Sequence, residues 1–329
     1  MAVTVLLGNA GSGKSTQCYR EIQACAAAGG KALLLVPDQA TYGAERHLAE
    51  SFDGQGFLGT QVVGFSRLAY KVFQERGLEH ASLSELARKI ILQRLLHKGE
   101  KEFSVLQTAA RQPNFADTAG RFLWECRSFC VTPEALRQAA EAVPSPTLSH
   151  KLEDISRLYE AYQAFLADHF GSADDTMTLL AREIGHYSFL QGAHVWVDGF
   201  QWFTPQQMEI LRQIERAASK VTITLTIDEA HLAQQRRETA LFHRAYEVYR
   251  DIKTLFPHME TAVVEKRPAG PLTAFRDAFF QTVPASMDRP VSALEIWECP
   301  DRDGEIDSVA RKIAALCRQG YRYRDFLVL

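Results

Sequence analysis

The sequence predicts an α/β fold with a parallel sheet and a large α-helical insertion. Three observations predict it. A short β-rich run at 2–7 ends directly in a glycine-rich loop. Further short apolar runs alternate with segments of helical spacing, which is typical of a parallel sheet. Between them, residues 83–185 carry helical periodicity alone.

The first segment, residues 1–82, is expected to open the α/β domain. Its apolar runs are short and rich in valine and leucine. Gly29 and Gly30 stop a helix, and Pro37 closes a strand. The expected elements are a strand at 2–7, a helix at 16–28, and strands at 31–36 and 61–65.

The insertion, residues 83–185, is expected to be helical because its apolar residues recur every three or four positions. Two runs show this spacing most clearly, namely Leu83, Leu86, Ile90, Ile91 and Leu95, and then Leu152, Ile155, Leu158, Tyr159, Tyr162, Phe165 and Leu166. Asp174 and Asp175 form a carboxylate pair that suits a helix N-terminus.

Residues 186–290 are expected to complete the α/β domain, and residues 291–329 to begin a second one. A proline-rich stretch at 267–290 is predicted to cross between them. The terminal apolar run suggests a truncated core strand and therefore a fragment. The expected elements are strands at 194–197, 221–226, 294–297 and 326–329, and helices at 205–218 and 304–317.

Composition sets limits on the function. A formal net charge of −3 over 329 residues excludes a uniformly basic nucleic-acid coat, but it leaves room for a local binding groove. No signal peptide and no apolar run of about 20 residues is present, which predicts a cytoplasmic protein without a membrane span. The six cysteines lack zinc-site spacing and are expected to be free thiols, with a partial metal site at Cys126 and Cys130 as the alternative.

Residues 8–15 read GNAGSGKS and fit the complete phosphate-binding loop pattern G-x-x-x-x-G-K-[ST]. The glycines let backbone N–H groups converge on phosphate oxygens, and the following helix adds its positive end. Lys14 would reach the β- and γ-phosphates of ATP, and Ser15 would hold Mg²⁺. A glycine-rich turn that matches by chance is the alternative. The expected nucleotide-binding residues are Gly8, Asn9, Ala10, Gly11, Ser12, Gly13, Lys14, Ser15 and Thr16.

Asp198 follows the apolar run Val195-Trp196-Val197, at the expected carboxyl end of a strand. In phosphate-binding-loop proteins an aspartate at this place holds Mg²⁺ beside the serine or threonine. Hydrolytic motors usually follow it with a glutamate that orients water, but Gly199 stands here. No active catalytic residue is therefore expected. A core strand that happens to end in aspartate is the alternative.

These motifs resemble those of superfamily 1 helicases of the UvrD type, which implies a RecA-like P-loop domain with the insertion as its 1B subdomain. The narrower resemblance is to the AddB family, which supplies one of the two chains of the bacterial AddAB helicase–nucleases. It rests on the glycine loop, LVPDQ-x-T at 35–41, FSRLA at 65–69 and VDGF-x-x-FTPQ at 197–206, and it runs over essentially all 329 residues.

This resemblance implies a protein that acts in double-strand break repair by homologous recombination. It implies a heterodimer with an AddA-type motor subunit, a degenerate motor, and recognition of the Chi recombination hotspot in single-stranded DNA. It also implies an exonuclease domain with a 4Fe–4S cluster beyond Leu329. The full-length protein is then expected to be a hydrolase.

Four residues stand at motif positions that the family uses for hotspot recognition: Gln39, Thr41, Arg67 and Phe203. Their chemistry suits base reading, because amide and hydroxyl groups donate and accept, arginine forks onto guanine, and an aromatic ring stacks on a base. The alternative is that Gln39 and Thr41 cap the next helix while Phe203 packs in the core. Phe200 and Trp202 raise the same question.

Two other functions remain open. The chain could be an active superfamily 1 DNA helicase or ATPase, which steady-state ATPase activity with single-stranded DNA would reveal. A small-molecule kinase with a phosphate-binding loop is disfavoured by the large insertion and by the absence of a lid signature.

Overall fold

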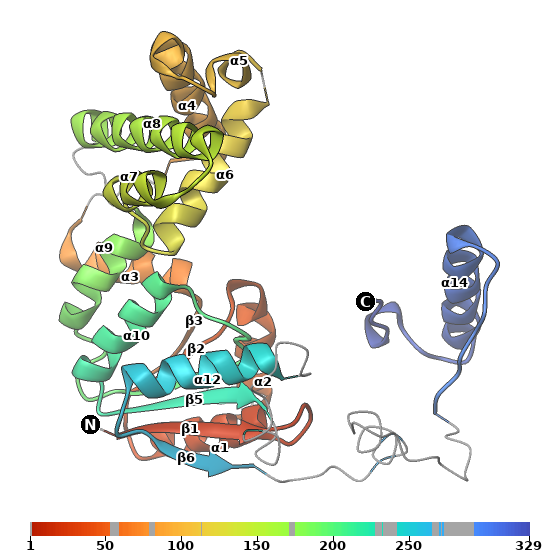
Figure 1. The fold of residues 1–329 in the computed structure, drawn as a ribbon. Coiled ribbons are helices and arrows are strands. Elements are labelled where there is room, and N and C mark those ends of the chain that lie inside the picture. The colour runs from red at the N-terminus through yellow and green to blue at the C-terminus, as the bar shows by residue number, and fades with distance from the viewer. Residues whose placement is uncertain are drawn as a thin grey trace. The chain divides into compact units, whose positions relative to one another are not determined.

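The computed structural model describes residues 2–52, 59–78, 83–112, 114–170, 175–227, 232, 242–264, 270, 272 and 293–329. The chain divides into two compact units, Met1–Lys266 and Arg267–Leu329 (Figure 1).

A six-stranded sheet with the order β3-β2-β4-β5-β1-β6 forms the centre of the first unit. Every neighbouring pair is parallel, which confirms the predicted α/β fold with a parallel sheet. The strands are β1 Ala2–Gly8, β2 Ala32–Leu35, β3 Thr60–Val63, β4 His194–Val197, β5 Lys220–Thr226 and β6 Glu260–Val263.

Two strands differ from the prediction. The third strand, expected to reach Phe65, ends at Val63, because Gly64 caps a helix that Phe65 begins. The sixth strand has no counterpart among the predicted elements. Its four residues, Glu260–Val263, are exposed and half polar, so they lack the apolar run that marks the other strands.

Helices cover both faces of the sheet, and alternate strand residues point to each face. On one side α1 (Lys14–Ala27) and α2 (Thr41–Ser51) pack on Leu6, Leu34 and Trp196. On the other side pack four helices, namely α3 (Phe65–Arg76), α9 (Thr176–Glu183), α10 (Pro205–Ala217) and α12 (His243–Leu255).

Between α3 and α9 the described residues form helices and no strand. They bury a separate apolar cluster that includes Leu92, Leu123 and Tyr162. Asp154 is fully buried there and accepts backbone N–H bonds from Ser104, Val105 and Leu106 at 2.8–3.0 Å. The helices are α4 Glu85–Gly99, α5 Gln107–Ala110, α6 Phe115–Ser128, α7 Pro133–Ala142 and α8 Pro146–Phe170, followed by α9.

Asp175 is the N-cap of α9 and accepts from the Thr178 backbone N–H at 2.8 Å. This confirms the helix N-terminal position expected for it, whereas Asp174 lies outside the described residues.

Short 3-10 turns lie at η1 Asp38–Ala40, η2 Glu100–Glu102, η3 Ile184–His186 and η4 Tyr323–Asp325.

In the second unit, the helix α14 (Arg302–Arg318) is present and extends slightly past the predicted bounds. The strands expected at 294–297 and 326–329 are absent, because these residues pair with no neighbouring strand in the described part of the chain. The predicted crossing segment at 267–290 lies almost wholly outside the described residues.

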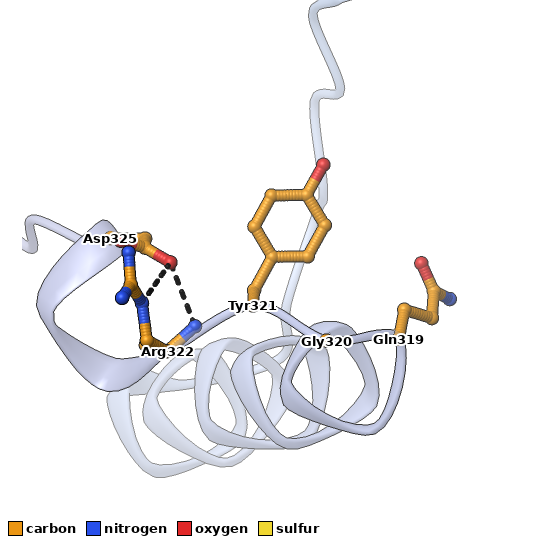
Figure 2. Close-up of a pocket in the computed structure, with 5 residues that line it drawn as sticks. All are labelled: Gln319, Gly320, Tyr321, Arg322 and Asp325. Atoms are coloured by element: carbon orange, nitrogen blue, oxygen red, sulfur yellow. Dashed lines mark hydrogen bonds and ion pairs between the residues drawn. The ribbon is translucent and has the colours of Figure 1, made fainter.

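A hollow of about 510 Å³ lies beside the end of α14, where Figure 2 shows its lining residues. Asp325 accepts from the Arg322 backbone N–H at 2.8 Å and pairs with its guanidinium, while the Tyr321 ring points away from them. The bond from the Arg322 backbone N–H to Asp325 caps η4. No predicted site residue belongs to this hollow.

Candidate functional site

The loops that carry the predicted site residues all follow strands of the sheet. Parallel strands place their carboxyl ends at one edge, where ligands of open α/β sheets bind. The glycine loop follows β1, and the PDQ loop (Pro37–Gln39) follows β2. The FSR turn (Phe65–Arg67), which begins α3, follows β3, and the DGF loop (Asp198–Phe203) follows β4. The fold therefore brings four separate motifs to one edge.

The glycine loop, Gly8–Gly13, curls around the side chain of Lys14. The Lys14 Nζ donates to the carbonyl oxygens of Gly8 at 2.7 Å and Asn9 at 2.9 Å. Gly11 and Gly13 have φ of 75° and 92°, in the left-handed region. A Cβ at Gly8 would clash with Ser12 and lie 2.7 Å from the Val264 carbonyl oxygen, so only glycine fits.

Lys14 is 7% exposed, and burial lowers the pKa of its ammonium while nearby Asp198 raises it. The Ser12 Oγ is buried and has no hydrogen-bond partner among the described residues. Ser15 and Thr16 are exposed in the first turn of α1. The loop thus holds a buried cation and an unsatisfied hydroxyl beside a helix N-terminus.

Asp198 directly follows β4 and is 7% exposed. Its carboxylate Oδ1 accepts a 2.5 Å hydrogen bond from Thr224 Oγ1 on β5, and its backbone N–H donates to the Leu35 carbonyl at 2.9 Å. Sequence reasoning missed Thr224. The alternating threonines in Val221-Thr222-Ile223-Thr224 could have signalled polar groups on one face of the strand.

The residues at this loop fit a nucleotide with Mg²⁺. Lys14, the backbone N–H groups of the glycine loop and Ser12 are donors of the kind that bind phosphate. Ser15 and Asp198 offer oxygen ligands, which Mg²⁺ prefers, and Mg²⁺ typically takes only one or two protein carboxylates beside phosphate and water.

Gly199 follows Asp198 with φ of 81°, a conformation that favours glycine. A Cβ there would lie 3.5 Å from the Pro37 ring. The position therefore carries no group that could align a water molecule, and it lies against the PDQ loop.

The PDQ loop and the FSR turn are joined by Asp38. The Ser66 hydroxyl donates to Asp38 Oδ2 at 2.8 Å, and a Cβ at Gly64 would overlap the Asp38 carboxylate. Gln39 is exposed in η1. Thr41 begins α2, and its hydroxyl donates to the Asp38 carbonyl at 2.9 Å. Asp38 and Ser66 belong to the predicted motifs, but the bond between them is not predicted from the sequence.

Arg67 lies in the first turn of α3 and pairs with Glu45 of α2 at 2.5 Å. Both side chains are partly exposed, at 53% and 38%. An exposed pair of this kind contributes about 0–1 kcal/mol, so a stronger acceptor could displace Glu45.

The aromatic residues of the DGF loop divide between two environments. Phe203 is half-buried and stacks on Phe200 with centroids 5.0 Å apart. Phe200 in turn meets Phe65 edge-on at 5.5 Å. Trp202 is 52% exposed. Phe203 is thus held in a cluster that links the DGF loop to the FSR turn.

The structure also shows the state of the cysteines and tests the described residues for metal-binding groups and membrane-spanning helices. All six cysteines are free: Cys18 and Cys126 are buried, and Cys130 is exposed. Within the described residues no group of three or more histidine, cysteine or acidic side chains is placed to hold a metal ion. In the same part of the chain, no helix has both the length and the apolar character needed to cross a membrane.

Comparison with known proteins identifies relatives over the whole chain. A family model described as ADDB, N-terminal, matches residues 5–279. The B subunit of the ATP-dependent helicase/deoxyribonuclease of Pelotomaculum thermopropionicum is 35% identical, and those of Bacillus subtilis and Desulforamulus reducens are 32% and 30% identical. Each comparison covers 100% of this chain but 30% of the relative. The chain therefore belongs to the AddB family and corresponds to its N-terminal region.

Proposed function

We propose that this chain is a nucleotide-binding, strand-reading region of a helicase–nuclease, with a degenerate motor that does not turn over ATP. One observation carries the proposal, namely the series of contacts that joins the loops after β2, β3 and β4. Gly199 lies against Pro37, Asp38 bonds to Ser66, and Phe65 meets Phe200. Through these contacts, the loop that carries Asp198 is connected to the loops that carry the proposed DNA-reading residues.

Nucleotide binding is supported by the glycine loop and Asp198. A RecA-like P-loop domain would place the β- and γ-phosphates against Lys14, where they would replace the carbonyls of Gly8 and Asn9 as acceptors. Bound Mg²⁺ would neutralise phosphate charge, with Ser15 and Asp198 on its protein side.

Absence of turnover is supported by Gly199. A water-positioning group commonly contributes orders of magnitude in rate, and glycine offers none. The arginines that stabilise transition-state charge would come from a second RecA-like domain, whose start is proposed at 291–329.

Reading of single-stranded DNA is supported by the side chains above the sheet edge. Gln39 and Arg67 are exposed and can reach base edges. The Thr41 hydroxyl donates to the Asp38 carbonyl and can still accept a hydrogen bond. Phe203 is half-buried, so Trp202 is the more accessible ring of this loop for stacking on a base.

The proposal for the whole protein follows the names of the relatives. Each is the B subunit of an ATP-dependent helicase/deoxyribonuclease. The proposed assembly is a cytoplasmic heterodimer with an AddA-type motor subunit, which acts on DNA ends in recombinational repair and recognises the Chi hotspot. The exonuclease domain and its 4Fe–4S cluster would lie beyond Leu329.

Nucleotide binding and turnover measured together test the proposal. Calorimetry on the full-length protein should show Mg²⁺-dependent ATP binding that Lys14→Ala weakens. Steady-state ATPase should stay far below about 1 s⁻¹, the low end of ordinary enzymes, with or without single-stranded DNA. Turnover above that rate, lost in Lys14→Ala, would support an active helicase instead. Absence of ATP binding would make the loop vestigial.

A further inference from the structure

A second hollow, of about 210 Å³, opens between α2, β3 and α3 and is lined by Glu45, Thr60, Gln61, Val62, Arg67 and Lys71. We call it the α2–α3 hollow. Its volume far exceeds the ~10–15 Å³ that one water needs. It shares Arg67 with the FSR turn, so it borders the surface proposed to read DNA.

The charge of the α2–α3 hollow favours an anion. Arg67 and Lys71 lie one turn apart on α3 and therefore face the same side of the helix. Glu45 pairs with Arg67 at 2.5 Å. Lys71 has no acidic partner among the described residues, so the hollow keeps one uncompensated positive charge that would repel a metal ion.

The hollow also offers a hydrogen-bond donor. Thr60 lines it, but the Thr60 Oγ1 is fully buried and does not face a ligand there. Gln61 accepts from the Tyr187 hydroxyl at 3.2 Å through Oε1, which leaves its amide nitrogen as a donor.

We propose that the α2–α3 hollow binds one phosphodiester of a single DNA strand. Lys71 supplies the charge, and the Gln61 amide donates to a phosphate oxygen. This rests on the proposed function, because it adds a backbone contact beside the base-reading residues. Such a contact fixes the register of the strand but carries no sequence information.

The test is the salt dependence of oligonucleotide binding by the full-length protein in its complex. For single strands, each phosphate contact contributes about 0.7 to the slope of log affinity against log salt. Lys71→Gln should lower that slope by about 0.7 and weaken all sequences alike, whereas Lys71→Arg should retain it. The matched control is Lys98→Gln, which replaces an exposed lysine of α4 and should change neither the affinity nor its salt slope.

The outcomes separate the two proposals. If Lys71→Gln leaves the slope unchanged while Gln39→Ala still alters sequence discrimination, the phosphate site is wrong and the proposed function stands. If the wild type binds no oligonucleotide, the proposed function fails. If inorganic phosphate binds in a Lys71-dependent manner but the strand slope is unchanged, the hollow takes free phosphate, and the assignment to DNA is overturned.

Discussion

Thr224 donates a 2.5 Å hydrogen bond to Asp198 across two neighbouring strands, and both side chains are buried. The bond engages Oδ1 of the carboxylate. Because β4 and β5 are parallel and in fixed register, the contact orients the aspartate toward the side of the sheet that carries α1. Thr224 is therefore a positioning residue for the proposed Mg²⁺ ligand.

Thr224→Val should weaken nucleotide binding in Mg²⁺ by about tenfold or more, because a hydrogen bond to a charged group contributes about 1.5–3 kcal/mol. Binding without Mg²⁺ should change much less. Isothermal calorimetry with and without Mg²⁺ measures the difference.

Thr222→Val is the matched control, since Thr222 is equally buried on β5 but contacts His194 at 3.0 Å. It should lose stability without a Mg²⁺-specific loss of nucleotide binding. Equal effects of the two substitutions would show that Thr224 acts only through the fold.

Gly199→Glu should not create an ATPase. The φ of 81° at this position strains any side chain by about 1–2 kcal/mol, so Gly199→Glu and Gly199→Ala should destabilise the fold similarly in urea unfolding. Steady-state turnover should stay far below about 1 s⁻¹ in both. Turnover that appears with glutamate but not with alanine would mean that the motor lacks only this one group.

Acid should destabilise the fold partly through His194. Burial, reinforced by Lys220 and opposed by Glu21, lowers the pKa of its imidazole to about 4, below the ordinary 6.5. Between these values the unfolded chain binds more protons than the folded chain. The contribution of His194 is therefore fully present above about pH 6.5 and is lost as the pH falls toward 4.

Urea unfolding of the wild type and of His194→Gln from pH 7 to pH 4 checks this. Glutamine can keep a hydrogen bond to Thr222 but does not titrate, so the stability of the variant should fall less steeply with acid. Parallel curves would place the pH dependence elsewhere.

The strands buried on both faces can be predicted from sequence, because short runs of apolar and β-branched residues mark them. The strand His194–Val197 matches its prediction to the residue. Glu260–Val263 has no such signal, since it joins the sheet through backbone pairing with β1 rather than through buried side chains. The strand expected at 326–329 is apolar, but pairing also requires a neighbour, and the described residues provide none.

The site, like the fold, can be predicted from the sequence only in part. Local patterns point to the glycine loop and to Asp198, because each motif lies within a few consecutive residues. The bonds Thr224–Asp198, Ser66–Asp38 and Arg67–Glu45 join different elements. Their partners depend on strand register and helix packing, which the spacing of residues along the chain does not reveal.

Base reading by the exposed loops predicts a specific pattern of losses. Gln39→Ala, Thr41→Ala and Arg67→Ala should each lower discrimination for the recognised sequence by about 1–3 kcal/mol. Glu45→Gln is the control for Arg67, because it removes the negative charge beside the guanidinium and keeps the guanidinium itself. It should leave discrimination intact and strengthen general affinity slightly.

The most direct test of the central claim is sequence discrimination by the full complex carrying Gln39→Ala. This side chain is exposed, so its loss should leave the fold intact. Affinity is measured for oligonucleotides with and without the hotspot sequence across a range of salt. We predict that the hotspot preference falls by about tenfold while general affinity and its salt slope stay unchanged. An unchanged preference, or an equal loss for every sequence, would contradict the proposal that this edge of the sheet reads DNA.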